Sequence, residues 1–115
     1  MTAAGSELAA RKRAVRAEMK ERLRAFAPER ERVSAGVVEH LSRSRAWREA
    51  RTAMVFLALP GEVDLDGLWA LTPRPVLAVA RVDWEACSMA PVVMDDPTRD
   101  FRVQRHLVRE PIGEA

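Results

Sequence analysis

The sequence has few residues that could cross-link the chain or anchor it in a membrane. Its 115 residues include one cysteine, Cys87, and no tyrosine. A single cysteine excludes an internal disulfide and any metal or redox motif built on paired cysteines, which favours a reducing compartment. No apolar run approaches the roughly 20 residues of a membrane span, and no apolar stretch follows the N-terminal charges as it would in a secretory signal. We therefore expect a cytoplasmic protein without a membrane partner.

Sites that depend on glycine, histidine or aromatic residues are also scarce. No Gly-rich phosphate loop is present. Nothing in the sequence brings His40 or His106 towards Cys87 or a serine, which argues against a nucleophilic triad. The Arg-rich helices lack the interleaved aromatic residues of single-strand binders and match no standard DNA-reading motif. These absences argue against nucleic acid as the partner.

Charge is divided unevenly along the chain. Residues 1–51 carry 13 Lys and Arg against 7 Asp and Glu, a net charge of +6, whereas residues 52–115 carry 6 against 10, a net charge of −4. Such asymmetry indicates that the first half faces an anion, which would be a nucleotide, a nucleic acid or a membrane. The simpler interpretation is a solvated, Arg-rich helical surface, and composition alone favours it.

Two helices are predicted in the first half. Residues 6–26 contain no Gly or Pro, Ser6 is a suitable N-cap, and Pro28 lies just beyond the end. A second helix is expected from about 29 to 44. Because the link is short, the helices are expected to form an αα-hairpin, with Trp47 packing beneath its exit. The first helix has one apolar face, which is expected to meet the core: Leu8, Val15, Met19, Leu23 and Phe26.

The periodicity changes after residue 52. Residues 53–59 are continuously apolar, as expected of a strand buried on both faces of a parallel sheet. A short helix is expected at about 64–71, with Asp64 as a candidate cap and apolar side chains facing inward. Residues 75–80 supply a second buried strand, so this strand–helix–strand unit is expected to be parallel and right-handed.

These elements indicate an α/β fold in a single domain of all 115 residues. It would consist of a helical hairpin over 1–51 and, over 52–115, a βαβ unit of a mostly parallel sheet. Further short strands are expected near 87–93 and 101–103, and the last seven residues carry no clear structural signal. Sheets of this class normally have more parallel strands and helices on both faces. We therefore expect a partial sheet, truncated before its C-terminal strands.

Two cations occupy unexpected positions on the first helix. At roughly 100° per residue, Lys12 lies about 20° from the middle of the apolar face and Arg16 about 60° from it. The two are one turn apart and project together, which suits contact with phosphate groups. The alternative is that the helix overhangs the body of the domain and Lys12 extends to water along its own aliphatic chain. Spacing alone favours this alternative.

Glu62 follows the C-terminal end of the first buried strand, where open α/β sheets place their ligands. A carboxylate there would accept hydrogen bonds from an amino-pyrimidine ring, or it would be a solvated turn residue, which is the simpler interpretation. Asp64 and Asp66 invite comparison with a metal site. We favour a capping role for Asp64 and plain exposure for Asp66.

Four segments form a pattern in their order and spacing: Lys12 to Arg16, and residues 56–64, 79–82 and 108–111. Together they resemble the 5-formyltetrahydrofolate cyclo-ligase family. The first is similar to the family's opening Lys–x–x–Leu–Arg, and the second to its first strand and a turn with Glu–Val/Ile–Asp/Glu. The third resembles its Leu–Pro–Arg–Val strand end, and the fourth its Ile–x–Glu–Pro. Such an order over nearly the whole chain is hard to obtain by chance.

The resemblance implies a compact α/β domain with a mostly parallel sheet. Members of the family convert 5-formyltetrahydrofolate to 5,10-methenyltetrahydrofolate with ATP and Mg²⁺. By this resemblance, Leu57 would form an apolar wall of the folate site, and Glu62 would accept hydrogen bonds from the pterin. Contact with the nucleotide phosphates, where cations stabilise developing charge, is implied for one segment: Lys12, Arg13, Ala14, Val15 and Arg16.

Two departures from the family pattern bear on activity. Ala80 stands where the family has proline, which is expected to loosen the strand exit without removing a reacting group. The family's Gly-rich Arg–x–Gly–x–Gly–x–Gly–x–Tyr–Asp loop, which contacts ATP, folate and Mg²⁺, would follow Pro111 and is absent from this sequence. We therefore expect the catalytic residues in a missing C-terminal segment and no metal ligand in this chain. The chain alone is expected to be inactive unless a complementing C-terminal half is supplied.

A function of a different class stays open. The basic first half would suit a non-catalytic helical adaptor that binds an acidic partner or nucleic acid, although the two buried-strand patterns argue against a purely helical one. Binding across salt concentrations would separate the two, because nucleic-acid affinity falls steeply with salt. Self-association is expected in addition, because a partial sheet leaves an unpaired edge and an uncovered apolar face.

Overall fold

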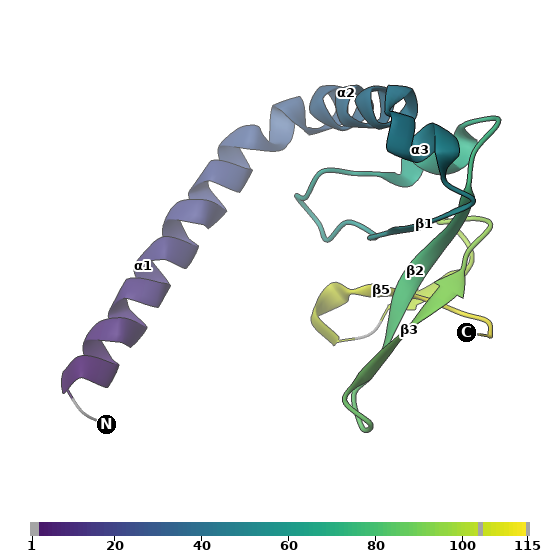
Figure 1. The fold of residues 1–115 in the computed structure, drawn as a ribbon. Coiled ribbons are helices and arrows are strands. Elements are labelled where there is room, and N and C mark those ends of the chain that lie inside the picture. The colour runs from purple at the N-terminus through teal and green to yellow at the C-terminus, as the bar shows by residue number, and fades with distance from the viewer. Residues whose placement is uncertain (1–2, 104, 115) are drawn as a thin grey trace.

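A computed structural model describes residues 3–103 and 105–114 of the chain (Figure 1). Helices fill the first half, and a mixed sheet follows, so the fold is α/β. The helices are, in chain order, α1 Ala3–Phe26, η1 Ala27–Glu29, α2 Arg30–Arg43, α3 Arg45–Glu49, η2 Asp66–Ala70 and η3 Arg105–Leu107, where η denotes 3₁₀ segments. The strands are β1 Thr52–Val55, β2 Val76–Asp83, β3 Ser88–Val93, β4 Phe101–Val103 and β5 Arg109–Pro111.

The first helix projects away from the rest of the chain (Figure 1). No residue of α1 is buried, and the radius of gyration is 17.4 Å, against about 13 Å for a compact domain of this length. The apolar face predicted to meet the core is therefore exposed, and that prediction is wrong. The predicted N-cap is also wrong, because Ser6 lies inside a helix that already includes Ala3 and Ala4, both strong helix formers.

α1 and α2 do not form the predicted hairpin. Between them, η1 is flanked by right-handed helical backbone angles at Phe26 and Arg30, and its last residue, Glu29, is also right-handed helical, so the chain bends without reversing direction (Figure 1). Proline is tolerated in the first turn of a helix, where its missing N–H has no partner to lose. Pro28 occupies that position in η1 and therefore bends the chain instead of turning it back. Within the described ranges, no helix combines the length and apolar character needed to cross a membrane.

The larger part of the core lies between α2, α3 and one face of the sheet. Trp47 is 9% exposed and packs with Leu65, Leu68 and Leu77, which confirms the prediction for the tryptophan. Its helix, α3, is capped by Ser44, whose Oγ accepts a hydrogen bond from the Trp47 N–H at 3.2 Å. The second predicted helix, α2, covers this face with the partly buried side chains of Val37, Val38 and Leu41.

The larger sheet is mixed, with strand order β1-β2-β3. β1 and β2 are parallel, as predicted, with Thr52 opposite Val76 and Val55 opposite Val79. β2 and β3 are antiparallel, so the prediction of a mostly parallel sheet is wrong. The reason is the length of the connection, because residues 84–87 alone join β2 to β3, and a parallel crossover needs about a dozen residues or more.

β1 and β5 differ most from the sequence expectation. β1 pairs only as far as Val55, and residues 56–59 leave the ladder. The sequence carries no signal for β5, which pairs with β4 in a two-stranded antiparallel sheet. β2 continues past its last pair with β1. There, the Val82 N–H of β2 donates a hydrogen bond to the buried carboxylate of Glu110 on β5 at 3.2 Å. The side chain of one sheet therefore satisfies the backbone of the other.

Candidate functional site

The segment after β1 forms a tight turn, which two hydrogen bonds between Glu62 and Leu59 close. The Glu62 N–H donates to the Leu59 carbonyl at 3.0 Å, and the Glu62 Oε1 accepts from the Leu59 N–H at 2.7 Å. Gly61 has a φ of +89°, a left-handed conformation that side chains adopt only with strain. The turn therefore fixes the Glu62 carboxylate at the carboxyl end of a parallel strand.

Side chains of α2 hold this turn from outside. Arg30 Nε donates to the Glu62 backbone carbonyl at 2.6 Å, and the buried Ser34 Oγ accepts from the Asp64 N–H at 2.8 Å. Asp64 closes a local turn just before η2, because its Oδ1 accepts a hydrogen bond from the Asp66 N–H at 2.8 Å. The N-cap position of η2 is Leu65, which makes no side-chain capping hydrogen bond, so the capping role predicted for Asp64 is wrong. The loop after β1 is attached to α2 at two points.

A cavity of about 450 Å³ lies beside this turn. Leu57 is 7% exposed and packs against Val79 and Met94 in a second core cluster, so it lies within the core and not on the cavity wall. Glu62 adjoins the lining through Leu59 but is not part of it. The lining includes apolar and charged side chains: Leu59, Pro60, Phe101, Arg30, Asp66 and Arg109.

Arg109 organises the polar side of the cavity, and sequence reasoning does not identify it. Its Nη1 and Nη2 atoms lie 3.1 and 3.3 Å from the two carboxylate oxygens of Asp66, a bidentate pair. It also donates to the carbonyls of Pro97 and Ala58 at 3.3 and 3.4 Å, and it lies 5.5 Å from the centre of the Phe101 ring. Because the Asp66 side chain is only 24% exposed, the prediction of plain exposure for Asp66 is wrong.

The candidate phosphate-binding segment lies elsewhere. Lys12 and Arg16 belong to α1, which is exposed over residues 10–25 and runs away from the strands (Figure 1). Leu57 and Glu62 share the β1 exit, but the structure does not bring segment 12–16 to them. The exposed Lys12 matches the alternative in which the helix overhangs the body of the domain.

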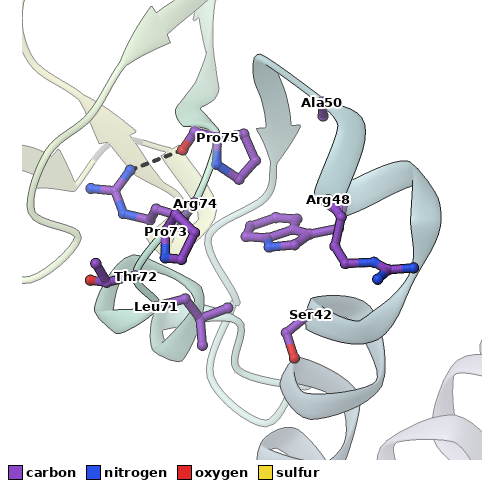
Figure 2. A pocket seen from close by; sticks show the side chains of 9 residues that line it. Ser42, Arg48, Ala50, Leu71, Thr72, Pro73, Arg74 and Pro75 are labelled. Carbon is purple, nitrogen blue, oxygen red and sulfur yellow. Dashed lines mark hydrogen bonds between the residues drawn. The ribbon is translucent and has the colours of Figure 1, made fainter.

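A larger cavity, of about 560 Å³, lies at the opposite end of the strands (Figure 2). Arg48 and Ala50 face residues 71–75, the segment that leads into β2. There Arg74 donates to the Pro75 carbonyl at 3.1 Å, the dashed contact in Figure 2. Open α/β sheets bind ligands at the carboxyl ends of their strands, whereas this cavity lies at the amino ends of β1 and β2. We therefore take the β1 exit as the candidate site.

Carboxylates in the turn before β4 serve local structure. Two hydrogen bonds from Thr98, the larger effect from its side chain and the smaller from its backbone N–H, hold the pKa of Asp96 below its ordinary value of 3.8. A hydrogen bond from Arg99 lowers the pKa of Asp100 in the same way. In residues 3–103 and 105–114, no group of three or more His, Cys, Asp or Glu is arranged to hold a metal ion.

The described residues of the β1 exit provide groups that suit ligand binding, but they include no activated nucleophile. The exit offers the carboxylate of Glu62 as a hydrogen-bond acceptor and, beside it, a cavity with apolar walls and an engaged cation. Such an arrangement suits a flat ligand with N–H donors along one edge. No protein-family model matches the chain, and no curated protein matches it. Assignment to a family therefore rests on the sequence resemblance alone.

Proposed function

We propose that the chain is the N-terminal part of a 5-formyltetrahydrofolate cyclo-ligase, which converts 5-formyltetrahydrofolate to 5,10-methenyltetrahydrofolate at the expense of ATP. The observation that supports this most is the turn at the β1 exit. The resembling segment, residues 56–64, follows β1, a strand of the parallel pair, and its glutamate is held in the turn by two hydrogen bonds to Leu59. Open α/β sheets use this edge for ligands.

In this proposal the folate ring system lies over the turn. One oxygen of Glu62 is engaged by the Leu59 N–H, and a carboxylate can accept several hydrogen bonds. The second oxygen, Oε2, accepts no hydrogen bond within the described chain and is the proposed acceptor for the pterin N–H groups. Leu57 supports the site from the core side, because it packs with Val79 and Met94 beneath the strand exit.

The nucleotide is assigned to the cations of α1. Lys12 and Arg16, one turn apart and exposed, suit two contacts to phosphate oxygens. When bound, ATP would supply the phosphoryl group that turns the formyl oxygen into a leaving group. The described residues offer no cluster for Mg²⁺, so no step is assigned to that ion on this chain. Because α1 does not approach the β1 exit, the proposal requires a complementing C-terminal half to close the site.

Activity of the chain by itself is the first test. We expect no formation of methenyltetrahydrofolate, followed by its absorbance, when the chain is given ATP, Mg²⁺ and 5-formyltetrahydrofolate. Adding a complementing C-terminal half should restore activity. Turnover by the chain alone would contradict the assignment of the catalytic residues to a segment outside this sequence.

A binding experiment tests the folate site directly. Glu62→Gln keeps an oxygen for the Leu59 N–H, so the turn persists, while the charge and the second carboxylate oxygen are lost. A hydrogen bond to a charged group contributes about 1.5–3 kcal/mol, so the Kd for 5-formyltetrahydrofolate should rise roughly ten- to a hundredfold. Titration calorimetry measures it, with Glu39→Gln as the control, because Glu39 is exposed on α2 and pairs with Arg43. Equal Kd values for the two variants would contradict the role of Glu62.

A second candidate, a basic adaptor, is favoured by one observation. α1, Ala3–Phe26, has no buried residue and carries 7 Lys and Arg against 3 Glu, which suits an acidic partner or nucleic acid. Affinity for single- or double-stranded DNA that falls by orders of magnitude between low and moderate salt would support this function. Folate binding that is insensitive to salt would favour the cyclo-ligase.

A further inference from the structure

An apolar stripe runs along α1 without a covering surface. Leu8, Val15, Met19 and Leu23 share one side of the helix at helical spacing, and they are 54%, 59%, 47% and 41% exposed. From Leu8 to Leu23 the stripe is about 22 Å long at a rise of roughly 1.5 Å per residue. Lys12 interrupts the stripe between Leu8 and Val15. Exposed apolar surface of this extent marks an interaction site.

The sheet presents a second uncovered apolar surface. Strand pairing places Met54, Ala78 and Val93 in one row across β1, β2 and β3, on the face opposite the buried Leu77 and Val79. Met54 and Val93 are 56% and 53% exposed, and the small Ala78 between them is 4% exposed. By alternation along the strands, the other positions of this face hold no charged residue: Thr52, Val76, Ala80, Val82, Met89 and Pro91.

The two surfaces match in size. From Val76 to Val82 the sheet face is about 20 Å long at roughly 3.3 Å per residue, close to the length of the stripe. At Ala78 and Val79, where both neighbours pair with β2, strands spaced by about 4.8 Å place β1 and β3 about 10 Å apart, which is the diameter of one α-helix. A single helix lying along β2 would therefore cover the face, as the layered architecture of α/β sheets requires.

α1 cannot reach this face of its own chain. α2, which follows α1, packs Val37, Val38 and Leu41 against the opposite face of the sheet. The connection between the two helices, η1, has 3 residues, and three residues span at most about 10 Å even when extended. Packed layers are themselves about 10 Å apart, so this connection is too short to pass around the sheet edge.

We propose that the chain forms a two-fold dimer in which α1 of each copy lies on the uncovered sheet face of the other. Each copy supplies one helix and one face, so the same contact is made twice and the assembly closes. Charge favours the exchange, because α1 has 7 Lys and Arg against 3 Glu, a net charge of +4, and residues 52–115 have a net charge of −4. The dimer does not depend on the cyclo-ligase assignment.

Light scattering after size-exclusion chromatography gives the first readout. The wild-type chain should have twice the mass of one copy. Val15→Asp/Met19→Asp charges the stripe and should halve the mass, without affecting the core, because α1 has no buried residue. The control is Ala10→Asp/Ala17→Asp, the same chemical change on the opposite side of α1, which should stay dimeric. A monomeric wild type, or a dimeric Val15→Asp/Met19→Asp variant, would overturn the proposal.

Mixing two variants distinguishes this dimer from the alternatives. Met54→Asp/Val93→Asp charges the sheet face at two exposed positions and should also be monomeric. Mixed with Val15→Asp/Met19→Asp, it should form a heterodimer, because one intact α1 then meets one intact face. A dimer of α1 helices would leave the sheet variant dimeric, and a face-to-face dimer would leave the helix variant dimeric. Either result, or two monomeric variants that do not associate on mixing, would refute the exchange.

Discussion

Replacement of Arg109 by glutamine measures how strongly the polar cluster joins β5 to the β1 exit. Arg109 makes two contacts with Asp66, at 3.1 and 3.3 Å, and the two side chains are 20% and 24% exposed. Exposed pairs contribute about 0.2–1 kcal/mol, whereas breaking a fully buried pair costs about 3–5 kcal/mol. The Arg109–Asp66 pair lies between these limits and also satisfies two carbonyls, so we expect Arg109→Gln to cost about 2 kcal/mol.

Urea denaturation at a fixed protein concentration gives this free energy of unfolding. The matched control is Arg43→Gln, because Arg43 pairs with Glu39 at 2.6 Å but the side chains are 76% and 62% exposed. That variant should lose about 0.3–0.5 kcal/mol, as helix pairs do. A double-mutant cycle with Asp66→Asn isolates the pair itself. Equal losses for Arg109→Gln and Arg43→Gln would refute the reasoning from burial.

Two further predictions concern charge on the surface. With a complementing C-terminal half supplied, Lys12→Ala should raise the KM for ATP roughly ten- to a hundredfold at unchanged Tm. The control, Lys20→Ala, two turns along α1, should change neither quantity. Equal KM values for the two variants would show that Lys12 is a solvated surface residue. Thr98→Val removes the hydroxyl that donates to Asp96 at 2.6 Å, so the pKa of Asp96 should rise towards 3.8. Because the pKa of Asp96 is lowered in the folded state, the carboxylate stabilises the fold at pH values above the unfolded pKa of 3.8, and this stabilisation is lost as the pH falls through the folded pKa. Carboxyl NMR titration of the wild type and of Thr98→Val measures the shift, and an unchanged pKa of Asp96 in the variant would contradict the role of the Thr98 hydroxyl.

Periodicity predicted the type of most elements but not what covers them. The continuous apolar runs correctly indicated β1 and β2 as a parallel pair, and the spacing of α2 indicated the helix that packs on them. The same rule identified the apolar face of α1 and wrongly assigned it to the core. A period of 3.6 residues identifies which side of a helix is apolar. Which surface packs against that side of α1 depends on the direction in which the chain continues after Pro28. That direction is set by three residues of η1.

The candidate site was predicted only where its contacts are local. Glu62 and Asp64 act on partners two or three residues away, so turn chemistry was enough to give Asp64 a local backbone partner, although Leu65 and not Asp64 is the N-cap of η2. Arg109 and Asp66 are 43 residues apart, and they meet because β5 returns to the exit of β1. Residues 109–111 carry no strand signal, unlike β4 of the same length, and nothing in the sequence near Arg109 indicates Asp66 as its partner.

The two proposals for α1 constrain each other through Lys12. This residue lies about 20° from the middle of the apolar stripe, so docking of α1 on a sheet face without charged residues removes its ammonium group from water or forces it to the rim. A phosphate bound at Lys12 and Arg16 would have to be desolvated with it, and the docked helix should therefore bind phosphate more weakly than the free helix. Because such coupling is reciprocal, nucleotide should favour the monomer by mass action. Nucleotide binding to α1 and docking of α1 in the exchanged dimer are thus alternative states of one helix. Added nucleotide should therefore lower the fraction of dimer, and dimerisation should weaken nucleotide binding.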